Sequence, residues 1–292
     1  MAETPWYFTP SDVNSLHSKR ADYRIFYGKD PEQFGDLRLP TGPKPYPVAI
    51  IIHGGCWISK FATLQNTAAL SDALRDAGIA TWNIEYRATD QNGGGFPGTF
   101  DDIAKAADHL REIAGQHQLD LNHVIAMGHS AGGHLALWLA ARRKLASDSA
   151  VYSSNPLNLN GVLVLGGVPD LKAFKALGKT VCGEDVIDKL LGGSDERYKE
   201  ISPKELLPLG TPQILVYGAD DQVVPAELGR VYVKATQEKG DVAVLYVVKN
   251  AAHHEYNAPN SITWPLVKSA VFSLLQGSMI KDSSSFHCLI EE

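Results

Sequence analysis

The chain has 292 residues, of which 44% are hydrophobic and 21% charged, and its net charge is −6. This length suits one large globular domain, and the ordinary apolar content excludes a disordered or fibrous protein. Acidic and basic residues are interspersed without a basic stripe, so we expect no nucleic-acid partner.

Three cysteines, Cys56, Cys182 and Cys288, are odd in number and widely spaced. This spacing indicates neither a disulfide framework nor a metal site, and it is typical of a reducing compartment. The amino terminus lacks a charged segment followed by an apolar run, and the longest apolar runs are only strand-sized. We therefore expect no signal peptide, no membrane span and a cytoplasmic location.

The first half of the chain predicts strands alternating with helices. Residues 1–20 are expected to form a surface arm with a short helix capped by Ser11. Strands are expected at residues 23–27, 36–39, 48–52 and 80–85. The first two should form an antiparallel edge, whereas the third is apolar throughout, as a strand covered on both faces requires. Helices should cover residues 67–77 and a segment capped by Thr99 with Asp102.

The second half continues this alternation. Strands are expected at residues 124–127, 162–165, 213–217 and 243–248, and helices after Ser130 and near residues 226–239 and 262–275. Residues 170–210 contain helical pieces and no strand, which predicts a lid or cap insertion, and residues 277–292 should be a loose tail. The whole chain, residues 1–292, is thus predicted to be a single α/β domain with a mostly parallel, doubly wound sheet and helices on both faces.

The sequence Gly128-His-Ser-Ala-Gly132 joins an apolar strand to a helical pattern. Gly-x-Ser-x-Gly in this position is the signature of a nucleophile elbow, a strained turn that exposes the serine at the carboxyl end of a strand. A Cβ atom at either glycine would collide with neighbouring backbone. We therefore predict Ser130 as a catalytic nucleophile, with the N–H group of Ala131 facing a developing oxyanion.

Two later loops supply a base and an acid in the chain order that this architecture uses. Gly218-Ala-Asp-Asp follows one strand, and its spacing favours Asp221 over Asp220 as the acid. Lys249-Asn-Ala-Ala-His-His-Glu follows the next strand and offers His253 as the base, with His254 as a pocket wall or surface residue. No further ligand cluster accompanies these histidines, so we expect no metal and no cofactor.

The segment His53-Gly-Gly-Cys-Trp57 follows a buried strand upstream of the elbow. Glycines let backbone N–H groups turn toward a substrate oxygen, so Gly55 and Cys56 are predicted to complete the oxyanion hole. Trp57 and Phe96 are predicted to bind substrate as pocket walls. Phe96 lies in a Gly-rich loop, residues 92–98, whose composition fits a pocket rim and fits a simple spacer somewhat better.

Together these motifs resemble the α/β-hydrolase superfamily and, within it, the branch of kynurenine formamidase-like proteins and small esterases. The resemblance spans roughly residues 20–275 and includes His53-Gly-Gly-x-Trp57, the Gly-His-Ser-Ala-Gly elbow, Gly218-x-x-Asp221 and His253-His-Glu-Tyr256. It implies that Ser130 is the nucleophile, His253 the base and Asp221 the residue that orients it. Cys56 departs from the aromatic or small residue common in these relatives.

We therefore expect a serine hydrolase that acts on a small carboxylic ester or an aryl formamide through an acyl-enzyme. A lactonase or a peptidase of the same fold is the alternative among enzymes, and a ligand-binding protein on a hydrolase scaffold is the alternative outside them. The expected partner is a small-molecule substrate, without nucleic acid or membrane, and a homodimer remains an open alternative.

Overall fold

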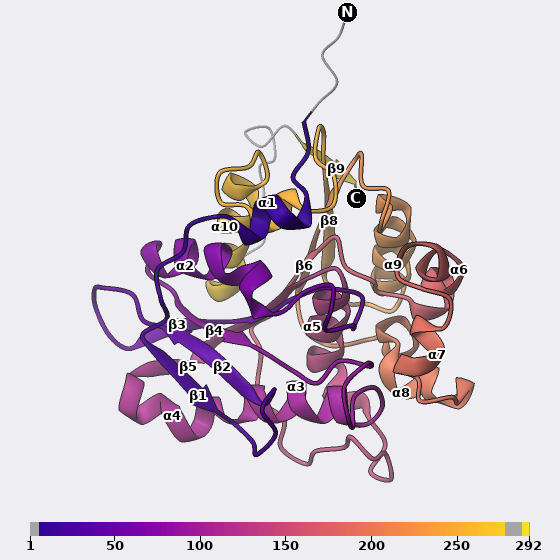
Figure 1. Cartoon of the computed structure of the whole chain (residues 1–292), viewed down its shortest axis with the longest axis horizontal. Helices are drawn as coiled ribbons and strands as arrows, with labels where there is room; N and C mark the ends of the chain where they lie inside the picture. The colour runs from indigo at the N-terminus through magenta and orange to yellow at the C-terminus, as the bar shows by residue number, and fades with distance from the viewer. Residues whose placement is uncertain (1–5, 278–287, 292) are drawn as a thin grey trace, which may run out of the picture.

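The computed structural model describes residues 6–277 and 288–291, and Figure 1 shows the chain. These residues form one nine-stranded sheet in the order β1-β2-β4-β3-β5-β6-β7-β8-β9. The strands are β1 (Tyr23–Phe26), β2 (Phe34–Arg38), β3 (Tyr46–Ile52), β4 (Ala80–Ile84), β5 (Leu119–His129), β6 (Gly161–Leu165), β7 (Gln213–Gly218), β8 (Ala243–Val248) and β9 (Cys288–Glu291). Strands β4, β3 and β5 to β8 are parallel, and β1, β2 and β9 are antiparallel to their neighbours. The predicted fold class is confirmed, as is the antiparallel edge.

Helices cover both faces of this sheet (Figure 1). The α-helices are α1 (Pro10–Asn14), α2 (Ala68–Asp76), α3 (Gly98–Asp108), α4 (Leu110–His117), α5 (Ala131–Ala141), α6 (Leu171–Val181), α7 (Val186–Leu190), α8 (Tyr198–Ile201), α9 (Ala226–Glu238) and α10 (Trp264–Leu275). Short 3-10 turns are η1 (Leu64–Thr67), η2 (Arg142–Lys144), η3 (Asp195–Arg197), η4 (Pro203–Leu206) and η5 (Glu255–Asn257). Helices α2 and α10 pack on one face, and α3, α4, α5, α6 and α9 pack on the other.

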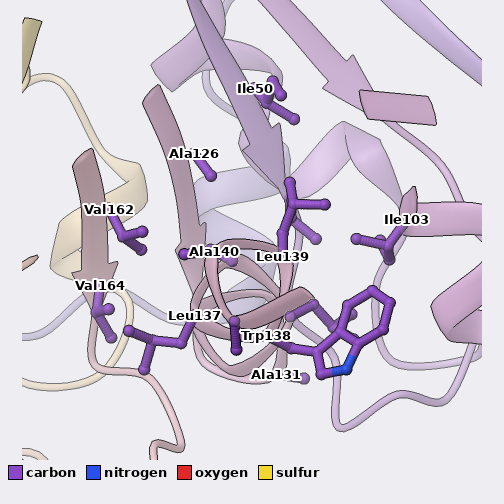
Figure 2. Close-up of a cluster of buried hydrophobic side chains, with 14 of the residues drawn as sticks. Ile50, Ile103, Ala126, Ala131, Leu137, Trp138, Leu139, Ala140, Val162 and Val164 are labelled. Atoms are coloured by element: carbon purple, nitrogen blue, oxygen red, sulfur yellow. The ribbon is translucent and has the colours of Figure 1, made fainter. Parts of the chain in front are cut away.

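Every residue of α5 is buried. Its inner side packs on strands β5 and β6, where Leu137 lies near Val162 and Val164 (Figure 2). The segment between β6 and β7 covers its outer side. One contact between them is a hydrogen bond from the indole N–H of Trp138 to the carbonyl of Glu200, at 3.0 Å. A helix that is apolar all round requires cover on all sides, and the segment over residues 170–210 supplies it.

Two predicted helix caps are wrong. Thr9, not Ser11, caps α1 and forms a reciprocal capping box with Asp12. Helix α3 begins at Gly98, so Thr99 lies inside it, and the Thr99 hydroxyl donates to the carbonyl of Arg87. The Asp102 carboxylate accepts from the guanidinium of Arg87 at 2.7 Å, so a tertiary contact replaces the local cap.

The predicted loose tail, residues 277–292, is also partly wrong. Residues 278–287 lie outside the described part of the chain, but Cys288–Glu291 forms β9 and pairs with β8 (Figure 1). An exposed edge strand leaves a row of unpaired backbone groups, and β9 satisfies those of β8. Within the described residues, no helix is long and apolar enough to cross a membrane.

Candidate active site

Ser130 lies at the junction of β5 and α5 in the conformation expected of a nucleophile elbow. Its φ of 54° and ψ of −119° are strained for a residue with a side chain. A Cβ atom on Gly128 would lie 2.1 Å from the carbonyl oxygen of Gly132, and one on Gly132 would lie 2.0 Å from that of Ile52. Both glycines are therefore required by close backbone contacts on either side of the serine.

Asp221 follows β7 and His253 follows β8, and the two side chains form a buried pair. The Nδ1 atom of His253 donates to Oδ2 of Asp221 at 2.8 Å. The other carboxylate oxygen accepts from the backbone N–H groups of Val223 and Val224 at 2.9 and 2.8 Å. Because an ionised carboxylate only accepts, the proton of His253 lies on Nδ1, which leaves Nε2 free to accept another. Asp220 instead interacts with Tyr7.

Tyr256 supports the same carboxylate, a contact that the sequence analysis missed. Its hydroxyl donates to Oδ2 of Asp221 at 3.3 Å and accepts a short hydrogen bond from the N–H of Gly218. Burial and the charge of Asp221 raise the pKa of Tyr256 well above its ordinary value, so it remains a donor. The sequence places Tyr256 three residues after His253, but spacing alone gives no signal for this contact.

His129 connects the elbow to the histidine loop. Its Nε2 atom donates to the carbonyl of His253 at 2.7 Å, and its Nδ1 atom accepts from the amide of Asn257 at 3.1 Å. Burial and the neighbouring His253 lower the pKa of His129 well below its usual range, so the ring is neutral. This contact fixes the backbone of His253 beside Ser130, which is adjacent to His129 in the chain.

The turn after β3 has an unusual backbone. Gly55, Cys56 and Trp57 have φ values of 96°, 55° and 56°. Among the described residues, Gly55 and Cys56 donate no backbone hydrogen bond to another protein group. The N–H of Ala131, in the first turn of α5, likewise lacks an intrahelical acceptor. These three predicted oxyanion donors therefore lie at chain positions where N–H groups are available to a ligand.

A buried pair, His53 and Glu85, lies at the start of this turn. Nε2 of His53 lies 2.6 Å from the Glu85 carboxylate, and Nδ1 lies 2.8 Å from the carbonyl of Gly54. Both partners are acceptors, so a ring with a proton on each nitrogen satisfies both contacts. Burial raises the pKa of Glu85, but the charge and hydrogen bond of His53 outweigh it, and the net pKa is lowered.

Ser130, His253, Gly55 and Cys56 line one cavity of about 190 Å³. Its apolar walls are Phe61, Val181 and Val223. His254 also lines it, and burial together with electrostatic repulsion from the neighbouring His253 lowers the pKa of His254 to about 4, which keeps this ring neutral.

The two aromatic residues predicted to bind substrate do not line this cavity. Trp57 is 1% exposed and packs in the core, where its indole N–H donates to His134 at 3.2 Å. Phe96 stacks under the guanidinium of Arg197 at 4.6 Å and lines a separate groove. Both predictions are wrong, and the Gly-rich loop contacts α7 rather than the site, since Phe96 N–H donates to the carbonyl of Leu190.

The predicted surface arm reaches the cavity. Pro10 lines it, and the N–H of Phe8 donates to the Glu255 carboxylate at 2.9 Å. The same carboxylate accepts from the N–H of Ala252, one residue before His253, at 2.9 Å. The arm therefore forms one wall of the site and is tied to the histidine loop.

Cys56 and Cys182 form a disulfide, contrary to the prediction from cysteine spacing. Their Cα atoms are 5.6 Å apart, a usual separation for such a bond. The sequence reasoning failed because the two cysteines are 126 positions apart, and such a separation gives no local signal. Among the described residues, no group of three or more His, Cys, Asp or Glu side chains is arranged to hold a metal ion.

Comparisons with known proteins agree with this geometry. Residues 36–236 match the model of the BD-FAE family. Esterase LipC of Mycobacterium tuberculosis is 26% identical over 266 residues, which cover 85% of this chain and 64% of that protein. A protein of Oryza sativa subsp. japonica named as a probable isoprenylcysteine alpha-carbonyl methylesterase is 26% identical over 258 residues, covering 78% and 57%. The chain spans about three-fifths of the length of these curated relatives.

Solved structures support the fold. Inhibited esterase B of Lactobacillus rhamnosis superposes with a TM-score of 0.74 at 21% identity, covering 90% of this chain and 91% of that one. A truncated carbohydrate esterase from gut microbiota superposes with a TM-score of 0.72 at 20% identity, covering 87% and 95%. These structures show the fold alone, and the family match together with the esterase relative confirms the predicted α/β-hydrolase superfamily. The kynurenine formamidase-like branch stays a prediction.

Proposed function

The chain belongs to the BD-FAE family, and we propose that it is a serine hydrolase that cleaves small carboxylic esters through an acyl-enzyme. The observation that carries this proposal is the buried Asp221–His253 pair in one cavity with the strained Ser130. A buried acid–base pair, a fixed tautomer and a nucleophile that faces the cavity are the requirements for activating a hydroxyl group.

In the proposed reaction, Nε2 of His253 takes the proton of Ser130 as Oγ attacks the carbonyl carbon. Asp221 stabilises the imidazolium that forms, and the N–H groups of Gly55, Cys56 and Ala131 bind the oxyanion. His253 then gives its proton to the leaving group, and the C–O bond of the ester breaks. Water, activated by the same imidazole, releases the acid and restores Ser130.

The size of the cavity favours a short acyl group. About 190 Å³ is small beside the roughly 300–1,000 Å³ of ordinary ligand pockets. Phe61, Val181 and Val223 surround it with apolar atoms, which suits an acetyl to butyryl chain. Formyl is the smallest acyl group, so an aryl formamide is the second substrate class that this volume supports.

The disulfide removes the reason that the cysteines gave for a cytoplasmic location, because such bonds persist mainly in oxidising compartments. The proposal therefore names a reaction and no cellular location. The proposed partner of the protein is a small-molecule substrate.

A fluorophosphonate probe with p-nitrophenyl esters of two to eight acyl carbons tests this function. We expect one label on the native protein, none on Ser130→Ala, and turnover that falls beyond four carbons. N-formylkynurenine, assayed in parallel, separates formamide from ester preference. An unlabelled native protein, or undiminished label on Ser130→Ala, would overturn the proposal.

A further inference from the structure

The Cys56–Cys182 disulfide joins the turn of the oxyanion hole to the carboxyl end of α6. Cys56 is partly exposed and lines the catalytic cavity, whereas Cys182 is 6% exposed and caps α6. Val181, the last residue of α6, lines the same cavity. The bond therefore connects two walls of the site that are far apart in the chain.

The backbone at Cys56 needs an external restraint. Non-glycine residues at positive φ are strained, and they persist only where the surroundings hold them. Trp57 is held by its buried side chain and by its carbonyl, which accepts from the N–H of Thr89 at 2.7 Å. Among the described residues, the N–H and carbonyl of Cys56 itself make no hydrogen bond. The turn around it is closed by the N–H of Ile58, which donates to the carbonyl of Gly55 at 2.8 Å, and the disulfide is the covalent contact that holds Cys56 against α6.

We propose that Cys182 is a positioning residue of the oxyanion hole and acts through its disulfide to Cys56. This inference rests on the proposed function, because it assigns a task to a bond beside the reacting carbonyl. With the bond intact, the N–H groups of Gly55 and Cys56 are pre-oriented toward the oxyanion. With the bond broken, the turn gains freedom and the donors must be ordered during the reaction.

The site is consequently sensitive to thiol reductants. A dithiol attacks one sulfur of the Cys56–Cys182 bond, and its second thiol completes the exchange. The protein gains two electrons and two protons as two thiols, and the reductant is oxidised to a disulfide. Access through the cavity reaches the Cys56 side of the bond.

The test compares Cys182→Ser, Cys56→Ser and the double variant with Cys288→Ser, a control that leaves both bonded cysteines intact. Turnover of p-nitrophenyl acetate is measured per site titrated with fluorophosphonate, so that misfolded protein does not count. We expect kcat to fall about 10- to 100-fold in the first three proteins, with KM changed less than about threefold. The double variant should match the single ones, because all three lack the same bond.

Dithiothreitol should lower kcat of the native protein to a similar extent and leave the double variant unchanged. A denaturing thiol titration should find one free thiol in the native protein and three after reduction. Three free thiols before reduction, or a Cys182→Ser variant with kcat within threefold of the native value, would overturn the inference. A native protein that neither labels nor turns over would instead refute the proposed function.

Discussion

Replacing Asp221 by Asn is expected to reverse the hydrogen bond that sets the tautomer of His253. Two backbone N–H groups, of Val223 and Val224, donate to Oδ1 of Asp221. In the variant the amide oxygen remains with these donors, so the amide NH2 faces Nδ1 of His253. The imidazole must then accept at Nδ1 and carry its proton on Nε2, where it can no longer accept a proton from Ser130.

The expected loss in kcat is about 10⁴-fold, equivalent to about 5.4 kcal/mol in activation free energy. Asp220→Asn is the matched control, because it changes the neighbouring carboxylate of the same loop. Asp220 interacts with the partly exposed Tyr7, a contact that solvent screens, so the control should lose no more than about fivefold in kcat.

Both variants are assayed with p-nitrophenyl acetate at saturating substrate, and near-ultraviolet circular dichroism reports whether each is folded. The geometry requires Asp221→Asn to be the far slower enzyme. If Asp220→Asn loses more turnover, or if folded Asp221→Asn retains a tenth of the native kcat, the assignment of the acid is incorrect.

Three further predictions concern stability. Burial lowers the pKa of His134 to about 4 from an unfolded value near 6.5. The contribution of this shift to the free energy of unfolding is therefore complete above pH 6.5, and it declines by about 1.4 kcal/mol per pH unit down to about pH 4. Urea midpoints should fall between pH 8 and pH 5, and they should fall less steeply in His134→Gln. Glu85→Gln leaves a buried imidazolium without its counter-charge and should cost about 3–5 kcal/mol in urea unfolding, against under about 1 kcal/mol for the exposed Glu227→Gln. Gly132→Ala should lower the melting temperature or prevent folding, because its Cβ meets a carbonyl oxygen at 2.0 Å, whereas Gly115→Ala, with open space around it, should not.

Each of these has a clear opposite result. A urea midpoint that is constant from pH 8 to 5 would mean that buried histidines are protonated in the folded protein. Equal losses in Glu85→Gln and Glu227→Gln would mean that the buried pair carries no charge. A normal melting temperature in Gly132→Ala would mean that the elbow has more room than its backbone contacts allow.

The polar residues of the site could be predicted because each follows a strand end. Parallel strands place their carboxyl ends at one edge, so the loops that carry Ser130, Asp221 and His253 must meet there. A few neighbouring positions indicate each of these residues. Glycines flank Ser130 at the elbow, and small residues precede His253. This part of the site depends on short-range signals and on one rule of topology.

The apolar walls could not be predicted, because they depend on contacts between distant segments. Trp57 is next to the oxyanion turn in sequence, yet its side chain packs against His134. Thr99 and Asp102 match a capping pattern, but Arg87 engages both. Periodicity and spacing contain no information on which of several nearby partners a side chain will choose.

The participation of Pro10 in the cavity has a practical consequence for handling the protein. Attaching a bulky reporter at the amino end, or trimming the first helix to ease crystallisation, would disturb the Phe8–Glu255 contact and open one side of the chamber. Substrate preference would then shift although every reacting group is untouched. Immobilisation for biocatalysis should therefore use a surface far from α1, such as the exposed residues of α4.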